Sequence, residues 1–138
     1  MRVYISGVFD LFHFGHIRFL KKCKNLYPTA HLIIGIHNDK DTKEYKRKPI
    51  MTQEERHISI LESGLADEII LNAPILETKD FYQLHKIDLV VHAHSHEEDK
   101  FYQTKCYKDA YEMGIFKRID YQSGISTTEL INRILKKN

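Results

Sequence analysis

The chain has 138 residues, of which 42% are hydrophobic, and its formal net charge is +2. This length suits one hydrophobic core, and no low-complexity stretch or long linker divides it, so we expect a single domain over residues 1–138. The scattered charges of both signs argue against a nucleic-acid partner but leave small anions as ligands. The chain has two cysteines, no signal-peptide pattern and no apolar run near the ~20 residues of a membrane span. We therefore expect a soluble cytoplasmic protein without a membrane partner.

Short aliphatic runs alternate with amphipathic stretches along the chain. The runs predict strands at residues 2–6, 31–37, 67–71, 88–93 and 116–121. Ile17, Leu20 and Cys23 recur at helical spacing after the first run, and residues 52–63 place Ile58 and Leu61 on one helical face.

Two helix starts carry a recognisable pattern. Thr52 with Glu55, and Ser126 with Glu129, fit the capping box, in which two side chains satisfy free amides at the beginning of a helix. The alternation of strands and helices predicts an α/β fold: a five-stranded parallel sheet with helices on both faces. Ligands of such sheets bind beyond the carboxyl ends of the strands.

The first strand-to-helix connection carries the sequence GVFDLFHFGH, residues 7–16. Gly7 and Gly15 allow the backbone to approach a ligand closely. A phosphate near the start of this helix would meet free amides, the positive end of the helix dipole, and the imidazoles of His13 and His16. The alternative is a structural turn with two solvated histidines, and the short motif alone does not decide between them.

The wider sequence resembles the cytidylyltransferase family. The first motif is followed by TQEER at 52–56, ADEIILNAP at 66–74 and SGISTTELINRI at 123–134, in the family's order and spacing. Several segments are most similar to the phosphocholine enzymes, KPIMTQEER is also close to the phosphoethanolamine enzymes, and the glycerol 3-phosphate enzymes are similar in length. The resemblance implies a Rossmann-like homodimer.

It also implies a reaction in which a phosphate oxygen of a small phosphoalcohol attacks the α-phosphorus of CTP and expels pyrophosphate. Mg²⁺ is expected to accompany CTP. Catalysis would rest on positioning and charge stabilisation. The residues that the resemblance assigns to catalysis are His13, His16 and Lys46. Those assigned to the nucleotide are Gly7, Val8, Phe9, Asp10, His13, His16, His92, Ser126 and Thr127, and those assigned to substrate phosphate are Lys46 and Arg56; no metal ligand is assigned.

Several of these residues also have simpler interpretations. Asp10 would serve as a turn residue that binds its own backbone, and Ser126 as a helix cap. Lys46 lies in a basic run in which Arg47 or Lys48 would substitute for it. Arg56 would pair with a glutamate such as Glu55.

Three positions depart from the family pattern. Tyr121 stands where the last motif, usually RTEGIST, has its arginine, which removes a cationic clamp. Gly64 stands where the central motif, usually RYVDEV, has another arginine. Ala93 and His94 replace an acidic pair.

The last of these segments, HAHSHEED, also suggests a metal. His92, His94 and His96 would share one face of an extended strand and bind zinc. Because the chain should leave the strand near Ala93, we favour the interpretation that histidines replace acidic residues beside the nucleotide.

Three hypotheses about function remain open. The first is an active cytidylyltransferase, with phosphocholine or phosphoethanolamine ahead of glycerol 3-phosphate. The second is a nucleotide-binding module with reduced or lost catalysis, and the third is a nucleotidyltransferase that uses another nucleoside triphosphate. Nothing after the helix that begins at Ser126 corresponds to an amphipathic membrane helix, so no activation by lipid is expected.

Overall fold

A computed structural model describes residues 1–120 and 124–137 of the chain. The elements in order are β1 (Arg2–Gly7), α1 (Phe14–Leu26), β2 (His31–Ile36), α2 (Asp39–Tyr45), α3 (Gln53–Ser63), β3 (Glu68–Leu71), α4 (Lys79–Leu84), β4 (Leu89–Ala93), the 3₁₀ helix η1 (His96–Glu98), α5 (Asp99–Thr104), α6 (Lys108–Glu112), β5 (Phe116–Ile119) and α7 (Thr127–Lys136). Each of the five predicted strands is present. The predicted α/β Rossmann-like class is therefore confirmed.

The five strands form one sheet in the order β3-β2-β1-β4-β5, and every recorded strand pair is parallel. The chain builds outward from β1 through β2 to β3, then returns to place β4 on the other side of β1. Such a reversal of strand order opens a crevice at the carboxyl ends of the two central strands. The fold thus predicts a ligand site above the ends of β1 and β4.

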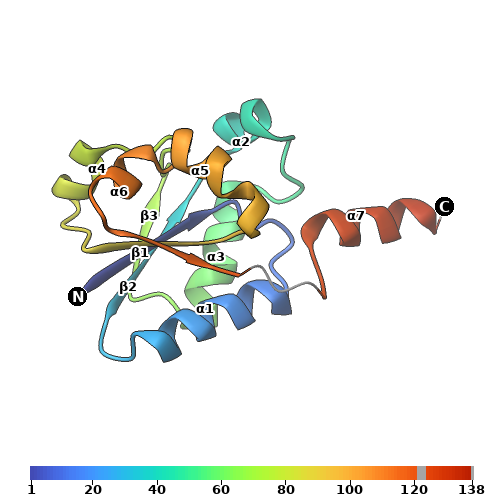
Figure 1. Ribbon diagram of the computed structural model, residues 1–138. Coiled ribbons are helices and arrows are strands. Elements are labelled where there is room, and N and C mark those ends of the chain that lie inside the picture. Colours follow the sequence, from blue (N-terminus) through green and yellow to red (C-terminus); the bar gives the residue numbers. More distant parts are fainter. Residues whose placement is uncertain (121–123, 138) are drawn as a thin grey trace.

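Helices cover both faces of the sheet (Figure 1). On one face, Leu20 and Cys23 of α1 and Ile60 of α3 join the alternate strand residues in one apolar core. On the opposite face, Tyr82 of α4 and Ala110 of α6 pack in a second core. Burial of these side chains on both faces explains why the inner strands β1, β2 and β4 are largely apolar.

The apolar face predicted for the helix at 52–63 is wrong. Ile58 and Leu61 are exposed, whereas Arg56 and Ile60 of α3 are buried. The two faces differ by about half a turn, and the pattern assigned the charged Arg56 to the outside. The partners of Arg56, described below, explain why a charged residue can face inward here.

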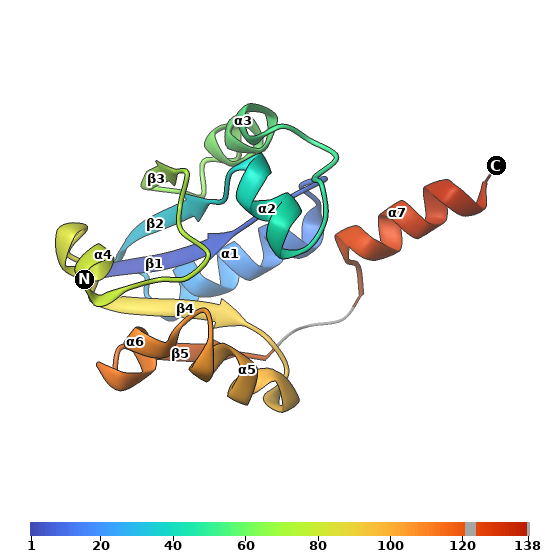
Figure 2. The ribbon, with the colours of Figure 1, turned by 90° about the horizontal axis from the view of Figure 1, so that it is seen from above.

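The last helix leaves the body of the molecule. Both views show α7 extending away from the sheet, with only its first turn near the rest of the chain (Figure 2). None of the α7 residues is buried, and Ile134 and Leu135 are exposed. Within the described residues, no helix is long and apolar enough to cross a membrane.

Candidate functional site

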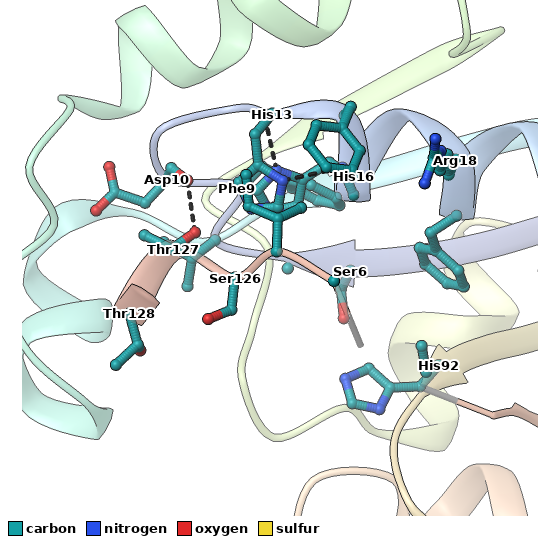
Figure 3. A pocket seen from close by; sticks show the side chains of 18 of the residues that line it. Ser6, Phe9, Asp10, His13, His16, Arg18, His92, Ser126, Thr127 and Thr128 are labelled. Atoms are coloured by element: carbon teal, nitrogen blue, oxygen red, sulfur yellow. Dashed lines mark hydrogen bonds between the residues drawn. The ribbon is translucent and has the colours of Figure 1, made fainter. Parts of the chain in front are cut away.

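A cavity of about 600 Å³ lies at the carboxyl ends of β1 and β4, where the strand order predicts it. Its size falls within the range of small-molecule sites, roughly 300–1,000 Å³. Its walls come from the loop after β1, the first turns of α1 and α7, the end of α2 and the end of β4. Figure 3 shows His13, the N-cap of α1, and His16, in its first turn, near Ser126 and Thr127 at the start of α7.

Two histidines of the cavity cap the start of α1 in a reciprocal manner. The Gly15 amide donates to Nδ1 of His13 at 3.0 Å, and the His13 amide donates to Nδ1 of His16 at 3.1 Å. Each Nδ1 is therefore an acceptor without a proton, so each neutral ring carries its proton on Nε2. The buried Nε2 of His13 has no hydrogen-bond partner among the described residues, which leaves a donor for a ligand in the cavity.

The surroundings of these rings keep them neutral. His16 stacks on Phe12 with ring centroids 5.4 Å apart and packs against Phe9 at 5.6 Å. Burial lowers the pKa of His16 to about 3, with a smaller contribution from His13 that opposes the effect of Asp10. Burial likewise lowers the pKa of His13. Both imidazoles can thus donate one hydrogen bond at neutral pH without carrying a charge.

The loop that holds this pair adopts an unusual backbone. Phe9 and Leu11 have φ angles of 57° and 49°, a left-handed conformation that bulky residues seldom adopt. Backbone strain such as that of Phe9 and Leu11 concentrates at functional sites, where the surrounding structure maintains it. The turn is also tightly packed, because a Cβ on Gly15 would lie 2.8 Å from the His13 ring, closer than real contacts allow.

Asp10 fastens this loop to a distant segment. Its carboxylate accepts hydrogen bonds from the amides of Leu11 at 3.1 Å, Ile50 at 2.8 Å and Met51 at 2.9 Å, and Arg47 lies 3.8 Å away. Asp10 lines the cavity, but both of its oxygens already have partners. Asp10 therefore serves as a turn residue that binds its own backbone, and it also holds residues 50–51 against the loop after β1.

The start of α7 completes the same wall. The Ser126 side chain accepts a hydrogen bond from the Glu129 amide at 3.1 Å, which confirms the predicted helix cap, whereas the Glu129 carboxylate accepts from Arg133 instead of completing the predicted capping box. The Thr127 hydroxyl donates to the Asp10 carbonyl at 2.8 Å (Figure 3). Gly7, Val8 and Phe9, which are predicted to contact the nucleotide, also line the cavity, although the Phe9 ring belongs to the core.

Cationic side chains outnumber acidic ones around the cavity. Lys46, at the end of α2, and its neighbour Arg47 line it, whereas Lys48 does not. Arg18 and Lys22, four residues apart on α1, also line it and were not predicted. The sequence could have indicated both residues, because positions 18 and 22 follow the histidine motif and lie on one helical face.

Arg56 does not line the cavity, contrary to the expected role in binding substrate phosphate. Its guanidinium is fully buried and donates to the carbonyls of Met51 at 3.1 Å, and of Val8 and His37 at 2.8 Å. A further bond reaches Asp39 at 2.6 Å. Glu55, its expected partner, instead caps α3 by accepting from the Thr52 amide. Arg56 therefore holds the backbone behind the cavity.

The positions that depart from the family pattern lie in different places. Gly64 ends α3 with a φ of 71°, a left-handed conformation in which an arginine would be strained. His92 and Ala93 line the cavity, while His94 is buried beside them. Tyr121 lies outside the described residues.

The three histidines at the end of β4 and just after it do not share one face as a zinc site would require. Nδ1 of His92 lies 2.9 Å from Nδ1 of His94, and His96 is exposed and contacts Asp99 instead. Within residues 1–120 and 124–137, no group of three or more His, Cys, Asp or Glu side chains could hold a metal ion.

The fold and the site define a Rossmann-like α/β protein with a cationic, imidazole-lined cavity at the reversal of strand order. The chain belongs to the Cytidylyltransferase-like family, which matches residues 4–133.

Curated relatives agree with this family assignment, and a solved structure shares the fold. The chain is 39% identical to choline-phosphate cytidylyltransferase 2 of Arabidopsis thaliana over 99% of its length, and 34% identical to the ethanolamine-phosphate cytidylyltransferase of Mus musculus over 97%. It spans only 45% and 34% of those proteins. A lipopolysaccharide core biosynthesis protein from Thermoplasma volcanium shares the fold with a TM-score of 0.67 and 23% identity, over 91% of this chain and 98% of that one.

Proposed function

We propose that this chain transfers the cytidylyl group of CTP to the phosphate of a small phosphoalcohol. In this reaction a phosphate oxygen of the alcohol bonds to the α-phosphorus of CTP, and the bond from that phosphorus to the β-phosphate bridging oxygen breaks. Pyrophosphate leaves with the electron pair, and the product is a CDP-alcohol. We favour phosphocholine or phosphoethanolamine as the acceptor because curated relatives of both kinds match the chain at 34–39% identity.

The observation that carries the proposal is the reciprocal cap of His13 and His16. The cap directs neutral N–H donors into a cavity that also contains the first turn of α1, where free amides and the helix dipole favour an anion. The unpartnered Nε2 of His13 would be satisfied by a phosphate oxygen. Donors fixed before the reaction stabilise charge as it develops on the triphosphate, without reorganising at that moment.

The cationic side chains would offset the negative charge of the two anionic substrates. Lys46 and Arg47 line one side of the cavity, and Arg18 and Lys22 line another. We assign Lys46 to the region between the triphosphate and the phosphoalcohol, where an ammonium offsets the repulsion between the two phosphates. Arg56 acts behind this site by fixing the carbonyls of Val8 and His37.

Mg²⁺ would enter as part of the substrate complex MgCTP. The residues present fit that role better than a resident ion, because both cavity carboxylates already have partners: Asp10 accepts three amide hydrogen bonds, and Asp120 pairs with Arg118. Mg²⁺ commonly keeps several waters and binds through substrate phosphates. A homodimer in the cytoplasm remains our prediction for the assembly and compartment, and light scattering of the purified chain tests the dimer.

The experiment that tests the proposal incubates the protein with each nucleoside triphosphate in turn, Mg²⁺, and phosphocholine, phosphoethanolamine or glycerol 3-phosphate. Pyrophosphate release that needs both CTP and a phosphoalcohol supports cytidylyl transfer. Release with another triphosphate identifies the alternative nucleotidyltransferase. Reactions without the phosphoalcohol serve as the control for hydrolysis.

Ala93 and His94 give a specific reason to retain a second function, a nucleotide-binding module with reduced catalysis. They occupy positions where the family resemblance leads us to expect acidic residues, and Ala93 lines the cavity. Calorimetric binding of MgCTP without pyrophosphate release from any phosphoalcohol would support this second function.

A further inference from the structure

A chain of hydrogen bonds leads from a carboxylate to the wall of the cavity. Nε2 of His94 lies 2.7 Å from Oδ1 of Asp99, and Nδ1 of His94 lies 2.9 Å from Nδ1 of His92. The His94 side chain is 1% exposed and does not line the cavity, while His92 does. This chain of bonds therefore reaches the cavity at His92.

The proton positions along this chain follow from what each group can donate. A carboxylate only accepts, so the bond to Asp99 places a proton on Nε2 of His94. The bond between the two Nδ1 atoms then requires one further proton, carried by either ring. If His94 carried it, an imidazolium would be buried next to Arg118, whose Nε already lies 3.2 Å from Asp99 and whose Nη1 donates to the His94 carbonyl at 3.3 Å. Arg118, whose side chain is 26% exposed, already pairs with the Asp99 carboxylate, so all these contacts are satisfied without a further proton on His94.

The remaining arrangement has a neutral His94 that accepts from Nδ1–H of His92. Burial lowers the pKa of His92 to about 3, with further contributions from His94, Lys46 and His37, so this ring holds a single proton at neutral pH. With that proton on Nδ1, the Nε2 of His92 keeps its lone pair. His13 and His16 have the reverse arrangement, because backbone amides occupy their Nδ1 atoms.

We propose that His94 and Asp99 are positioning residues that hold His92 as a hydrogen-bond acceptor in the cavity, opposite in polarity to the donors His13 and His16. This inference rests on the proposed function only for its catalytic consequence. Phosphate oxygens are acceptors and match His13 and His16, whereas His92 matches an N–H or O–H donor of a ligand. The donor can come from the nucleotide or from the phosphoalcohol, and phosphoethanolamine has N–H groups that the trimethylammonium group of phosphocholine lacks.

The first test reads the protons directly and needs no activity. Nitrogen-15 NMR of histidine-labelled protein near neutral pH distinguishes a protonated ring nitrogen from one with a lone pair, and single histidine variants assign the signals. We expect His92 to be protonated on Nδ1, and His13 and His16 on Nε2. A His92 ring protonated on Nε2 would overturn the proposal, even in a protein with full cytidylyltransferase activity.

Variants then test the positioning roles. His94→Phe removes the acceptor, and Asp99→Leu removes the carboxylate that orients it; both should leave His92 with a mixture of tautomers. Asp99→Asn retains an acceptor oxygen and should restore the wild-type signals. The control is His96→Ala, which removes another contact of Asp99 outside the chain of bonds and should change nothing. Unchanged His92 signals in Asp99→Leu would contradict the proposal even if His94→Phe failed to fold.

Kinetics show which ligand brings the donor. Loss of a fixed acceptor should lower kcat/KM by about ten- to a hundredfold in His94→Phe. A larger loss with phosphoethanolamine than with phosphocholine supports the acceptor role and assigns the donor to the phosphoalcohol. An equal loss with both supports the same role and assigns it to the nucleotide. An active His94→Phe with unchanged kcat/KM for both substrates would overturn the role in the reaction, and NMR of the wild type remains decisive if the chain lacks turnover.

Discussion

His13 and His16 share one helix start: the amide of His13 donates to Nδ1 of His16, and Nδ1 of His13 accepts from the amide of Gly15 inside the same turn. Each ring thereby satisfies a free amide and fixes its own tautomer. A capping role and a ligand-binding role are usually weighed as alternatives, but here the cap creates the donor. Experiments on this pair must therefore separate the two contributions.

The variant His13→Asn is designed to make that separation. Asparagine is a good N-cap, so the free energy of unfolding should change by less than about 1 kcal/mol, while the Nε2–H donor is lost. We expect kcat for cytidylyl transfer to fall by about 10²–10³. His13→Ala should lose a similar factor in kcat and about 1 kcal/mol of stability as well. Rates and urea denaturation are measured on the same preparations.

The control for these variants is His57→Ala, which changes an α3 histidine outside the cavity lining. It should leave kcat close to the wild-type value. A His13→Asn protein with wild-type turnover would rule out the proposed donor.

Gly15→Ala should damage the site without removing a functional group. The new Cβ would lie 2.8 Å from the His13 ring and 3.0 Å from Ile125, so the ring must move from its position in the cap. We expect kcat/KM to fall by at least about tenfold, since small displacements of positioned groups are costly in rate. Lys21→Ala, an exposed change in the same helix, is the control. Equal kcat/KM in Gly15→Ala and Lys21→Ala would show that the close approach of Gly15 to the His13 ring is unimportant.

Arg56→Lys should reduce stability. Lysine cannot reproduce the planar set of donors that reaches three carbonyls and Asp39, and its ammonium would be buried with fewer partners. We expect a loss of about 3 kcal/mol or more in the free energy of unfolding, measured by urea denaturation. The exposed Arg133→Lys, whose partner is Glu129, should change stability by less than about 1 kcal/mol. A fully stable Arg56→Lys with a raised KM would restore the phosphate-binding role.

A buried carboxyl on the other face of the sheet should make stability depend on pH. Glu77 is hydrogen-bonded to the hydroxyls of Ser6 at 2.6 Å and Tyr82 at 2.8 Å, and burial raises its pKa from 4.5 to about 8. The folded state thus binds a proton that the unfolded state releases above pH 4.5. Its contribution to stability is complete below pH 4.5 and is lost as pH rises through about 8, with a slope of at most ~1.4 kcal/mol per pH unit.

Glu77→Gln isolates that contribution, because the amide cannot ionise. The free energy of unfolding of the wild type, minus that of Glu77→Gln, should fall steadily between pH 5 and 8. Glu62→Gln, on the exposed side of α3, provides the control. A pH-independent difference would mean that Glu77 is not held as the neutral acid.

Local pattern was sufficient to predict the sheet and the helix starts. The inner strands β1, β2 and β4 are largely apolar because both faces are covered, and Thr52 and Ser126 cap helices by contacts within three residues. The motif in residues 7–16 also located the cavity, because a loop after β1 must lie at the carboxyl edge of a parallel sheet. These features depend on short-range chemistry that the sequence displays directly.

Features that depend on distant segments could not be predicted. The partners of Arg56 come from the loop after β1 and from the end of β2, so its helix position alone suggested an exposed ion pair. The bond from His94 to Asp99 requires η1 and α5 to fold back beside β4. Gly64 replaces an arginine of the family pattern, and its left-handed φ, which favours glycine, depends on how the chain leaves α3.

The most direct test of the account is ³¹P NMR of the protein with MgCTP and either phosphoethanolamine or phosphocholine. We predict the appearance of a CDP-alcohol and pyrophosphate in equal amounts, with CTP lost at the same rate, and a strongly reduced rate in His13→Asn. Conversion of CTP without a CDP-alcohol, or no reaction with either substrate in a folded protein, would contradict cytidylyl transfer by this chain.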